Sequence, residues 1–290
     1  MDEITTIAPL RERIREWRQS GLRIGLVPTM GNLHGGHLTL VDKALADCDR
    51  VVVSVFVNPT QFVPGEDFSA YPRTYAADCA MLKARNVDVV FAPDVAEIYP
   101  DGPSLHTQVA VPALDNILCG VSRPGHFRGV ATVVAKLLNI VQPDLAVFGL
   151  KDYQQLLVIE HMVRDLSLPV RVVGAAIARE PNGLAMSSRN VYLDEQQHDQ
   201  AAVLYATLTA MAERLTNGEH SLPGLIDWGL DQIQAAGLKP DYLEVRRAGD
   251  LATPQAGDED LVIAVAAYLG RARLIDNVQV SLPTPGLREG

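Results

Sequence analysis

One stretch decides the fold of the first half of the chain: Pro28-Thr29-Met30-Gly31-Asn32-Leu33-His34-Gly35-Gly36-His37. The apolar run 22–28 is typical of a buried strand, and the apolar spacing over 38–46 is typical of a helix. A strand, a glycine-containing turn and a helix in this order form the first unit of a parallel α/β sheet. Because ligands bind such sheets outside the carboxyl ends of the strands, the turn is a candidate binding site.

Strand-like and helix-like segments go on alternating through the first half of the chain. The run 51–57 is almost entirely apolar and β-branched, as in a strand that is covered on both faces. The alternation predicts an α/β fold, with a Rossmann-like parallel sheet and helices on both of its faces. The other expected strands are 87–91, 145–148 and 170–173, and the other expected helices are 10–19, 74–86, 127–141 and 152–164.

The second half of the chain has a different pattern. Four apolar side chains at helical spacing predict a long helix that ends at Asn217-Gly218. A second helix and three strands with short links follow, which predicts a smaller α+β domain. We therefore expect two domains, residues 1–177 and 178–290, with a frayed tail over 283–290. The four apolar residues are Leu204, Leu208, Met211 and Leu215, the second helix is 222–235, and the strands are 241–246, 261–268 and 272–281.

The composition is that of an ordinary globular protein. Of the 290 residues, 48% are hydrophobic and 21% are charged, which is enough to build a core without disulfides or a structural metal. The net charge of -10 argues against a nucleic-acid or anionic-membrane binder. The three cysteines, Cys48, Cys79 and Cys119, are odd in number and widely spaced, so no disulfide framework or zinc site is expected.

The sequence has no targeting or membrane-spanning signal. Its first residues are acidic and no apolar stretch follows them, which does not fit a secretory signal. The longest apolar candidate, 261–270, is about half of the ~20 residues that cross a bilayer. We therefore expect a cytoplasmic protein that binds neither nucleic acid nor a membrane.

The turn after the first strand suits a polyphosphate. Gly31, Gly35 and Gly36 let a phosphate approach the backbone closely, and the following helix supplies free N–H groups and the positive end of its dipole. His34 and His37 are three residues apart, so both can lean over that helix end and donate hydrogen bonds. The alternative is a glycine turn with two structural or metal-binding histidines, but the strand, glycines and helix together favour a nucleotide.

His34-Gly35-Gly36-His37 resembles the H-x-G-H signature of the nucleotidyltransferase superfamily, which includes the class I aminoacyl-tRNA synthetases. That superfamily carries a second phosphate-binding loop of K-M-S-K-S type after its last sheet strand. This chain has Met186-Ser187-Ser188-Arg189 at that place, and serine hydroxyls with an arginine fork suit a polyphosphate. Alone such a stretch is usually a solvated loop, but paired with the two histidines it predicts a nucleotide site.

Several further motifs narrow the resemblance to the pantothenate synthetase (pantoate–β-alanine ligase) family. They occur in order and cover essentially the whole chain, and the set is specific although no single member is. One departure is Leu150, where relatives often carry a polar residue. The motifs are Val55-Phe56-Val57-Asn58-Pro59-Thr60-Gln61-Phe62, Tyr71-Pro72-Arg73-Thr74, Arg123-Pro124-Gly125-His126-Phe127-Arg128-Gly129-Val130 and Phe148-Gly149-Leu150-Lys151-Asp152-Tyr153-Gln154-Gln155-Leu156.

The resemblance implies an ATP-dependent ligase. In this family ATP and pantoate form an enzyme-bound pantoyl adenylate and release pyrophosphate, and β-alanine then attacks to give pantothenate and AMP. The implied cofactor is ATP with Mg²⁺; the metal takes mostly water and phosphate oxygens, so no protein ligand is assigned, although Asp78 is a candidate. The family also suggests a homodimer.

The resemblance assigns roles to particular residues. His34, His37, Lys151 and Arg189 are the expected catalytic residues, because they suit the charge that develops as pyrophosphate leaves. The expected ATP-binding residues are Met30, Gly31, Asn32, Leu33, His34, Gly35, Gly36, His37, Gly149, Leu150, Lys151, Asp152, Ala178, Met186, Ser187, Ser188 and Arg189.

Gln61 and Gln155 resemble the family's pair of pantoate-binding glutamines, at the site where pantoate and β-alanine react. An amide offers donors and an acceptor, which suits hydroxyl groups and a carboxylate. An alternative for Gln155 is helix capping together with Asp152, and both roles can hold. His126 and Arg123 resemble a family loop near the phosphates and the substrate. The side chains that could face the gem-dimethyl group of pantoate, or simply belong to the core, are Met30, Phe56 and Val134.

Two other functions stay open at this stage. A nucleotidyltransferase of the same superfamily that uses a phosphate or nucleotide acceptor would need basic residues where Gln61 and Gln155 lie. A non-catalytic ATP-binding module would not need both histidines together with Ser187, Ser188 and Arg189.

Overall fold

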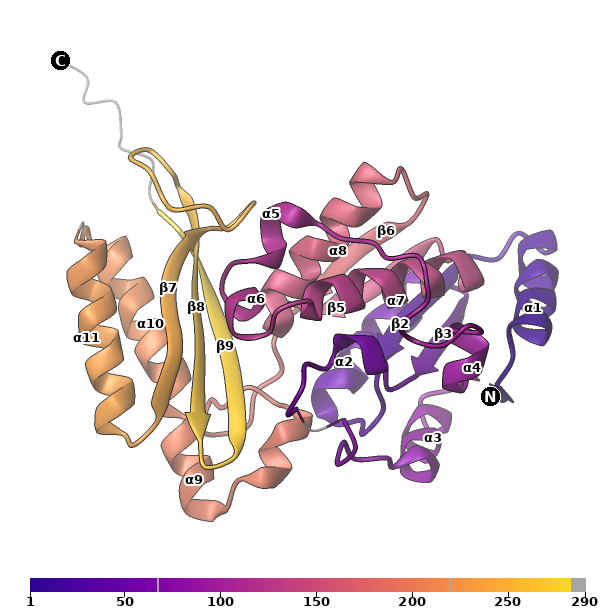
Figure 1. Ribbon diagram of the computed structural model, residues 1–290, viewed down its shortest axis with the longest axis horizontal. Helices are drawn as coiled ribbons and strands as arrows, with labels where there is room; N and C mark the ends of the chain where they lie inside the picture. Colours follow the sequence, from indigo (N-terminus) through magenta and orange to yellow (C-terminus); the bar gives the residue numbers. More distant parts are fainter. Residues whose placement is uncertain (67, 220, 283–290) are drawn as a thin grey trace. The chain divides into compact units, whose positions relative to one another are not determined.

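The strands of the first half lie side by side in one sheet of the computed structural model (Figure 1). In spatial order they are β1 Asp2–Ile4, β4 Val89–Phe91, β3 Arg50–Val55, β2 Ile24–Thr29, β5 Leu145–Gly149 and β6 Arg171–Ala175. Every pairing is parallel, and the β2–β3 register matches Thr29 with Val55 at the carboxyl edge. The predicted Rossmann-like parallel sheet is confirmed.

Helices flank this sheet, and strand alternation explains why. Val27 and Val53 point to one face of the sheet and belong to a buried cluster with side chains of α2 and α3. Their neighbours Leu26 and Val52 point to the other face and are equally buried, so both faces are covered. Helix α7 packs against β2 and against α1. The helices are α1 Ile7–Gln19, α2 Gly35–Asp47, α3 Tyr75–Lys83, α4 Val95–Ile98, α5 Pro112–Asp115, α6 Cys119–Ser122, α7 His126–Val141 and α8 Tyr153–Asp165, with the 3-10 helices η1 Pro59–Gln61 and η2 Leu150–Asp152.

The edge strand β1 was not among the expected strands. Two of its three residues, Asp2 and Glu3, are charged and exposed, so it has no apolar pattern to detect. Pairing with β4, from Asp2 beside Val89 to Ile4 beside Phe91, makes this segment a strand. Its conformation therefore depends on a partner far along the chain.

The second half forms a three-stranded antiparallel sheet with two long helices packed on it. The four apolar residues that predicted the long helix are all buried in one cluster with Leu225 and Ile233 of the next helix. The expected α+β domain is therefore confirmed as a fold class. Its elements are η3 Ser188–Tyr192, α9 Glu195–Ala201, α10 Val203–Thr216, α11 Leu222–Ala235, β7 Lys239–Arg247, β8 Asp260–Leu269 and β9 Ala272–Ser281.

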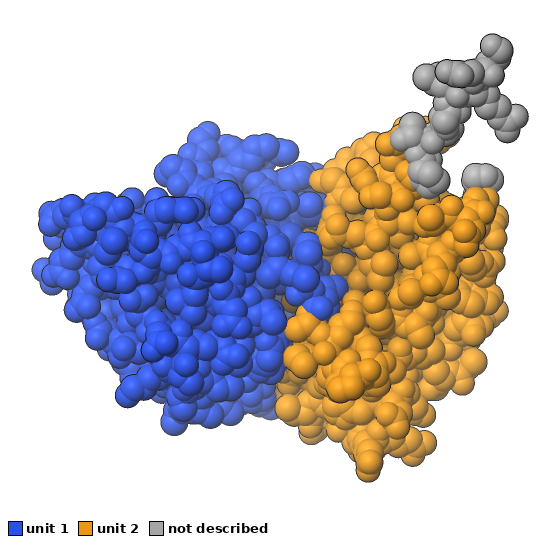
Figure 2. Space-filling view, turned by 180° about the vertical axis from the view of Figure 1, so that it is seen from behind, with its two compact units in different colours: residues 1–150, 154–177 blue, residues 151–153, 178–290 orange. Residues whose placement is uncertain are grey.

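The structure describes residues 1–66, 68–219 and 221–282, and the chain divides into two compact units (Figure 2). Unit 1 contains residues 1–150 and 154–177, and unit 2 contains 151–153 and 178–290. Residues 151–153 belong to unit 2, because the Lys151 carbonyl accepts a hydrogen bond from Asn277 and the Tyr153 hydroxyl donates one to the Ala248 carbonyl. The expected boundary near residue 178 leaves them in the first domain.

Two sequence expectations concern the chain's last residues and its membrane-spanning potential. The frayed tail over 283–290 lies outside the described residues. Within the described ranges, no helix combines the length and the apolar character that crossing a membrane requires.

Candidate functional site

The turn after β2 is tightly folded at the carboxyl edge of the sheet. Gly31 and Asn32 both adopt positive φ angles, 79° and 51°, which favour glycine and asparagine. A Cβ at Gly31 would lie 3.0 Å from Val55 Cγ1 and 3.1 Å from Asp78 Oδ2, so little room exists for a side chain. The Thr29 hydroxyl ties the turn to β3 by donating to the Ser54 carbonyl at 2.7 Å.

Asp78 braces this turn from α3. Its carboxylate accepts hydrogen bonds from the backbone N–H groups of Asn32 at 3.0 Å and Leu33 at 2.9 Å, and from the Thr74 hydroxyl at 3.0 Å. Asp78 is only 1% exposed. Asp78 was a candidate magnesium ligand, although no protein ligand was assigned, and in the structure both of its oxygens accept hydrogen bonds that hold the turn.

The two histidines lie together at the start of α2. His34 is the N-cap of the helix, and its Nδ1 accepts a hydrogen bond from the Gly36 N–H at 3.1 Å. A neutral His34 therefore carries its ring proton on Nε2, where it can donate to a ligand. The His37 ring lies 4.2 Å from the His34 ring between centroids and is tilted by 50°. The structure thus brings the predicted pair together on one helix end.

The rest of the predicted phosphate turn divides between backbone and side-chain roles. The Leu33 side chain is buried in the core cluster of unit 1, and its N–H donates to Asp78. Gly35 is exposed, whereas Met30, Asn32 and Gly36 are half-buried. Because the N–H groups of Asn32, Leu33 and Gly36 already donate within the protein, a ligand at this turn would meet mainly Gly35 and the histidine rings.

Gln61 is a buried amide whose orientation is set by its neighbours. Its Oε1 accepts a hydrogen bond from Asn58 Nδ2 at 3.1 Å, while its Nε2 lies 3.0 Å from the weak acceptor Met30 Sδ. Asn58 Oδ1 accepts in turn from the Tyr99 hydroxyl at 2.8 Å and from the Thr60 hydroxyl at 3.0 Å. The NH₂ group of Gln61 is therefore the end that can still donate strongly to a substrate.

Asn58 and Tyr99 were not among the predicted site residues. Asn58 also caps the short helix η1, where Pro59 occupies the first position, so an Asn-Pro pair after a strand was the available signal. Tyr99 carried no local signal, because it meets Asn58 only through the fold.

The start of α7 packs directly on η1. A Cβ at Gly129 would lie 2.3 Å from the Thr60 carbonyl oxygen, so this close approach needs glycine. His126 is buried, and its Nδ1 lies 2.7 Å from the Gln61 carbonyl, an acceptor that places the ring proton on Nδ1. Arg123 lies 3.0 Å from His126 Nε2 and pairs with Glu66. This loop therefore supports the backbone of Gln61.

Two adjacent glutamines on α8 differ in their hydrogen bonding. Gln154 is buried, accepts from the Cys119 N–H at 3.1 Å, and donates to the carbonyls of Leu114 and Ile117 at 2.8 Å each. Gln155 is half-buried, and its side chain makes no hydrogen bond with the part of the chain that the structure describes. The capping pair with Asp152 is therefore not formed, and Gln155 stays available for a ligand.

The remaining predicted ATP contacts lie at the end of β5 and in unit 2. Gly149 ends β5 beside Ala175, and the Leu150 side chain lies against Gly174. Lys151 is half-buried and Asp152 is exposed. In unit 2, the Met186 N–H donates to the Ala178 carbonyl at 2.9 Å, and the Ser187 hydroxyl caps η3 by accepting from the Arg189 N–H at 3.2 Å.

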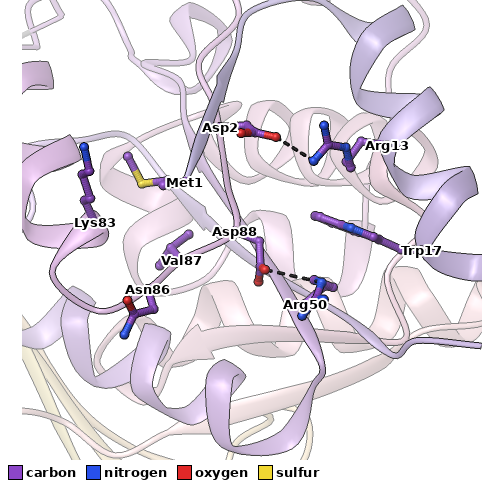
Figure 3. Close-up of a pocket in the computed structure, with 9 residues that line it drawn as sticks. All are labelled: Met1, Asp2, Arg13, Trp17, Arg50, Lys83, Asn86, Val87 and Asp88. Atoms are coloured by element: carbon purple, nitrogen blue, oxygen red, sulfur yellow. Dashed lines mark ion pairs between the residues drawn. The ribbon is translucent and has the colours of Figure 1, made fainter. Parts of the chain in front are cut away.

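The pockets of unit 1 distinguish the two ends of the sheet. A pocket of about 620 Å³ lies at the amino ends of β1, β3 and β4, and ion pairs join Arg13 to Asp2 and Arg50 to Asp88 within it (Figure 3). None of the predicted site residues lines it. A smaller pocket of about 320 Å³ is lined by Met30, Gly31, Phe56 and Asp78, beside the phosphate turn. The carboxyl end therefore carries the candidate site, as expected for such sheets.

The described residues gather no group of three or more histidine, cysteine, aspartate or glutamate side chains that could hold a metal ion.

Comparison with known proteins identifies the family. Residues 2–279 match the family model for pantoate-beta-alanine ligase. The chain belongs to the pantoate–β-alanine ligase family.

Relatives of this ligase family match the chain over nearly its whole length. The pantothenate synthetase of Alkalilimnicola ehrlichii is 56% identical over 282 residues, which cover 97% of this chain and 99% of the relative. The crystal structure of pantothenate synthetase from Thermus thermophilus has a TM-score of 0.89 at 45% identity, covering 98% and 100% of the two chains.

A further family member was solved with ligands. The pantoate–β-alanine ligase of Francisella tularensis, complexed with beta-gamma ATP and β-alanine, has a TM-score of 0.78 at 35% identity. It covers 96% of this chain and 97% of its own. The family resemblance expected from the sequence motifs is therefore confirmed.

Proposed function

We propose that the protein condenses (R)-pantoate with β-alanine, using ATP, to give pantothenate, AMP and pyrophosphate. Family membership supports the reaction, and one observation in the structure supports it most: His34 and His37 stand together at the carboxyl edge of the sheet, in the unit that also carries Gln61. Two imidazoles that can donate to phosphate and a neutral amide in the same unit support this reaction.

The first step forms the adenylate. A carboxylate oxygen of pantoate attacks the α-phosphorus of ATP, and the bond from that phosphorus to the pyrophosphate oxygen breaks. His34 donates from Nε2 and His37 donates beside it, so both stabilise the charge that develops on the phosphate oxygens. We propose that Lys151 and Arg189, which belong to unit 2, also stabilise this negative charge.

For each unit taken by itself, we propose the ATP contacts that the family resemblance implies. In unit 1 the contacts are those of the turn from Met30 to His37 and of Gly149 and Leu150. In unit 2 they are those of Lys151, Asp152, Ala178 and the segment from Met186 to Arg189. Mg²⁺ bound with ATP would neutralise charge on the phosphates, and phosphate oxygens and water would hold it, since no protein ligand is assigned.

The second step makes the amide bond. The amine of β-alanine attacks the acyl carbon of the adenylate, loses a proton, and AMP leaves. Gln61 donates to pantoate from Nε2, because its Oε1 is held by Asn58. Gln155 has both ends of its amide available for the same substrate.

The environment of Gln61 favours a carboxylic acid over a phosphate acceptor. The side chains that touch its amide, Asn58 and Met30, are neutral. The nearby cation Arg123 is paired with Glu66. A transferase with a phosphate or nucleotide acceptor needs unpaired basic groups there, so the ligase is the better assignment. From the family resemblance alone, we also propose a cytoplasmic homodimer.

Product analysis tests this function. The purified protein is incubated with ATP, Mg²⁺, pantoate and β-alanine, and the nucleotides and phosphates are separated. We expect pantothenate, AMP and pyrophosphate in equal amounts. Formation of ADP and inorganic phosphate instead would show an acyl-phosphate route and would rule out the adenylate.

A further inference from the structure

The segment before the second phosphate loop is a tight antiparallel turn. Arg179 and Ala185 form a β-bridge, and the Glu180 N–H donates to the Leu184 carbonyl at 2.8 Å. The Met186 N–H donates to the Ala178 carbonyl at 2.9 Å, which attaches the first residue of the loop to this turn. We call residues 178–186 the hairpin and residues 186–189 the loop.

Asn190 attaches the other end of the loop to the same hairpin. Its Nδ2 donates to Glu180 Oε1 at 2.7 Å and to the Ala185 carbonyl at 3.2 Å. Its backbone N–H donates to the Ser187 carbonyl at 3.1 Å, and the residue is 6% exposed. Ser187, Ser188 and Arg189 are therefore held between two attachments.

Glu180 is an unexpected residue in this place. A carboxylate near a loop that binds polyphosphate would repel the phosphates. Its presence there is explained if its charge strengthens hydrogen bonds that a neutral acceptor would make less strongly. One of its oxygens accepts from Asn190, and the other lies 3.2 Å from Nδ1 of His198 on α9. The carboxylate thus joins the end of the loop to the hairpin and to α9.

The hairpin itself is anchored in unit 2. Arg179 makes a two-point ion pair with Asp276 of β9, at 2.6 Å and 3.0 Å, and Asp276 is 4% exposed. The Arg179 guanidinium also lies 3.6 Å from the centre of the Tyr205 ring. A loop that is attached to this hairpin is therefore attached to the core of the unit.

We infer that Asn190 and Glu180 are positioning residues, which hold Ser187, Ser188 and Arg189 in the arrangement that meets the phosphates of ATP. The inference rests on the proposed function of that loop. We call Asn190 and Glu180 together the clamp. Donors that are already in place need no rearrangement when charge develops on the phosphates, so the clamp raises the rate of adenylate formation. It leaves the binding of pantoate unchanged, because neither residue belongs to the pantoate site.

Two pairs of variants test this role. Asn190→Ala removes both donors, and its control is Asn182→Ala, which removes two hydrogen bonds from the same hairpin, to the Leu184 N–H and the His198 carbonyl, but none to the loop. Glu180→Ala removes the acceptor, whereas Glu180→Gln keeps an oxygen for Asn190. Pantoate-dependent pyrophosphate release, the KM for each substrate and the melting temperature are measured for all four.

We expect Asn190→Ala and Glu180→Ala to lose roughly 10- to 100-fold in kcat/KM for ATP, with the KM for pantoate within about twofold of the wild type. Glu180→Gln should recover only part of that loss, because its neutral oxygen accepts less strongly from Asn190, and Asn182→Ala should stay near the wild type. The inference is overturned if Asn190→Ala keeps its ATP kinetics, or if Asn182→Ala matches it in every parameter.

Hydrogen exchange separates this inference from the function on which it rests. We expect amides of 187–189 to exchange faster in Asn190→Ala than in Asn182→Ala, whether or not ATP is added. Equal exchange in the two variants would overturn the clamp even if the enzyme is active. A wild-type protein that releases no pyrophosphate with pantoate would overturn the proposed function, while the exchange result would still decide whether the clamp exists.

Discussion

Nδ2 of Asn58 donates a hydrogen bond to Oε1 of Gln61 across 3.1 Å, and this contact decides which end of the Gln61 amide can meet a substrate. Asn58 is held in turn by the Tyr99 hydroxyl at 2.8 Å. All three residues are buried, so the chain of bonds is shielded from water, which strengthens it. The orientation of the Gln61 amide therefore depends on Tyr99, a residue distant in sequence.

Tyr99→Phe should weaken pantoate binding. The ring and its packing are kept, but Asn58 Oδ1 loses its shortest hydrogen bond and Gln61 becomes less well oriented. We expect the KM for pantoate to rise about 3- to 10-fold, the KM for ATP to stay within about twofold, and the stability to fall by about 1 kcal/mol.

Steady-state kinetics and urea unfolding check the Tyr99 prediction. The control is Tyr75→Phe, which removes a hydroxyl that donates at the surface to Glu3. Equal pantoate kinetics in the two variants would show that Tyr99 does not act through Gln61.

His34 should have two separable functions, because it both caps α2 and faces the proposed phosphate site. His34→Ala should slow adenylate formation by roughly 100-fold or more and lower stability by about 1 kcal/mol. His34→Asn should restore the cap and the stability, but not the rate.

His37→Ala is the comparison for this prediction, since His37 lies inside the helix and does not cap it. It should slow adenylate formation similarly without loss of the cap. Rapid-quench measurement of the first half-reaction, with thermal unfolding, checks both. A normal rate in His34→Asn would reduce His34 to a structural residue.

Asp78→Ala should act on stability and not on metal binding. It leaves the N–H groups of Asn32 and Leu33 without their acceptor in a buried turn. We expect a loss of about 2–4 kcal/mol in the free energy of unfolding, with the Mg²⁺ concentration for half-maximal rate unchanged. Urea unfolding and a Mg²⁺ titration measure the two. A large shift of the Mg²⁺ dependence at unchanged stability would restore Asp78 as a metal ligand.

Gln155→Glu should change pantoate binding without changing stability. The side chain makes no cap in the described structure, and the new charge would repel the carboxylate of pantoate. We expect the KM for pantoate to rise about tenfold or more, at an unchanged melting temperature. Gln154→Ala is the contrasting variant and should melt earlier, because three hydrogen bonds depend on that side chain. A stability loss in Gln155→Glu with normal pantoate kinetics would favour a structural role.

Most of the fold could be predicted from local sequence patterns, which do not depend on distant parts of the chain. The apolar run that predicted β2 and the spacing that predicted α2 need no knowledge of distant partners, and both elements formed around the expected turn. Strand β1 lacked such a pattern, because Asp2 and Glu3 are charged and only pairing with β4 makes the segment extended.

The site was harder to read, because a side chain's role depends on contacts across the fold. Gln154 and Gln155 cannot be told apart by their sequence context. Only the fold brings Cys119 and Leu114 to Gln154, whose amide they engage in hydrogen bonds. The hydrogen bonds of Asp78 could not be predicted from its neighbours in the sequence either, because its oxygens meet the turn near Asn32 through tertiary structure. Patterns of residue type thus locate a site, whereas packing assigns its hydrogen bonds.

The most direct test of the adenylate mechanism follows one oxygen atom. Pantoate labelled with oxygen-18 in its carboxylate is converted with ATP and β-alanine, and the products are examined by mass spectrometry. If the carboxylate attacks the α-phosphorus, one labelled oxygen must leave with AMP when the amine attacks the acyl carbon. We predict labelled AMP and unlabelled pyrophosphate. The other labelled oxygen stays in the amide carbonyl of pantothenate in either case. Unlabelled AMP, with the departing labelled oxygen in inorganic phosphate, would contradict the mechanism.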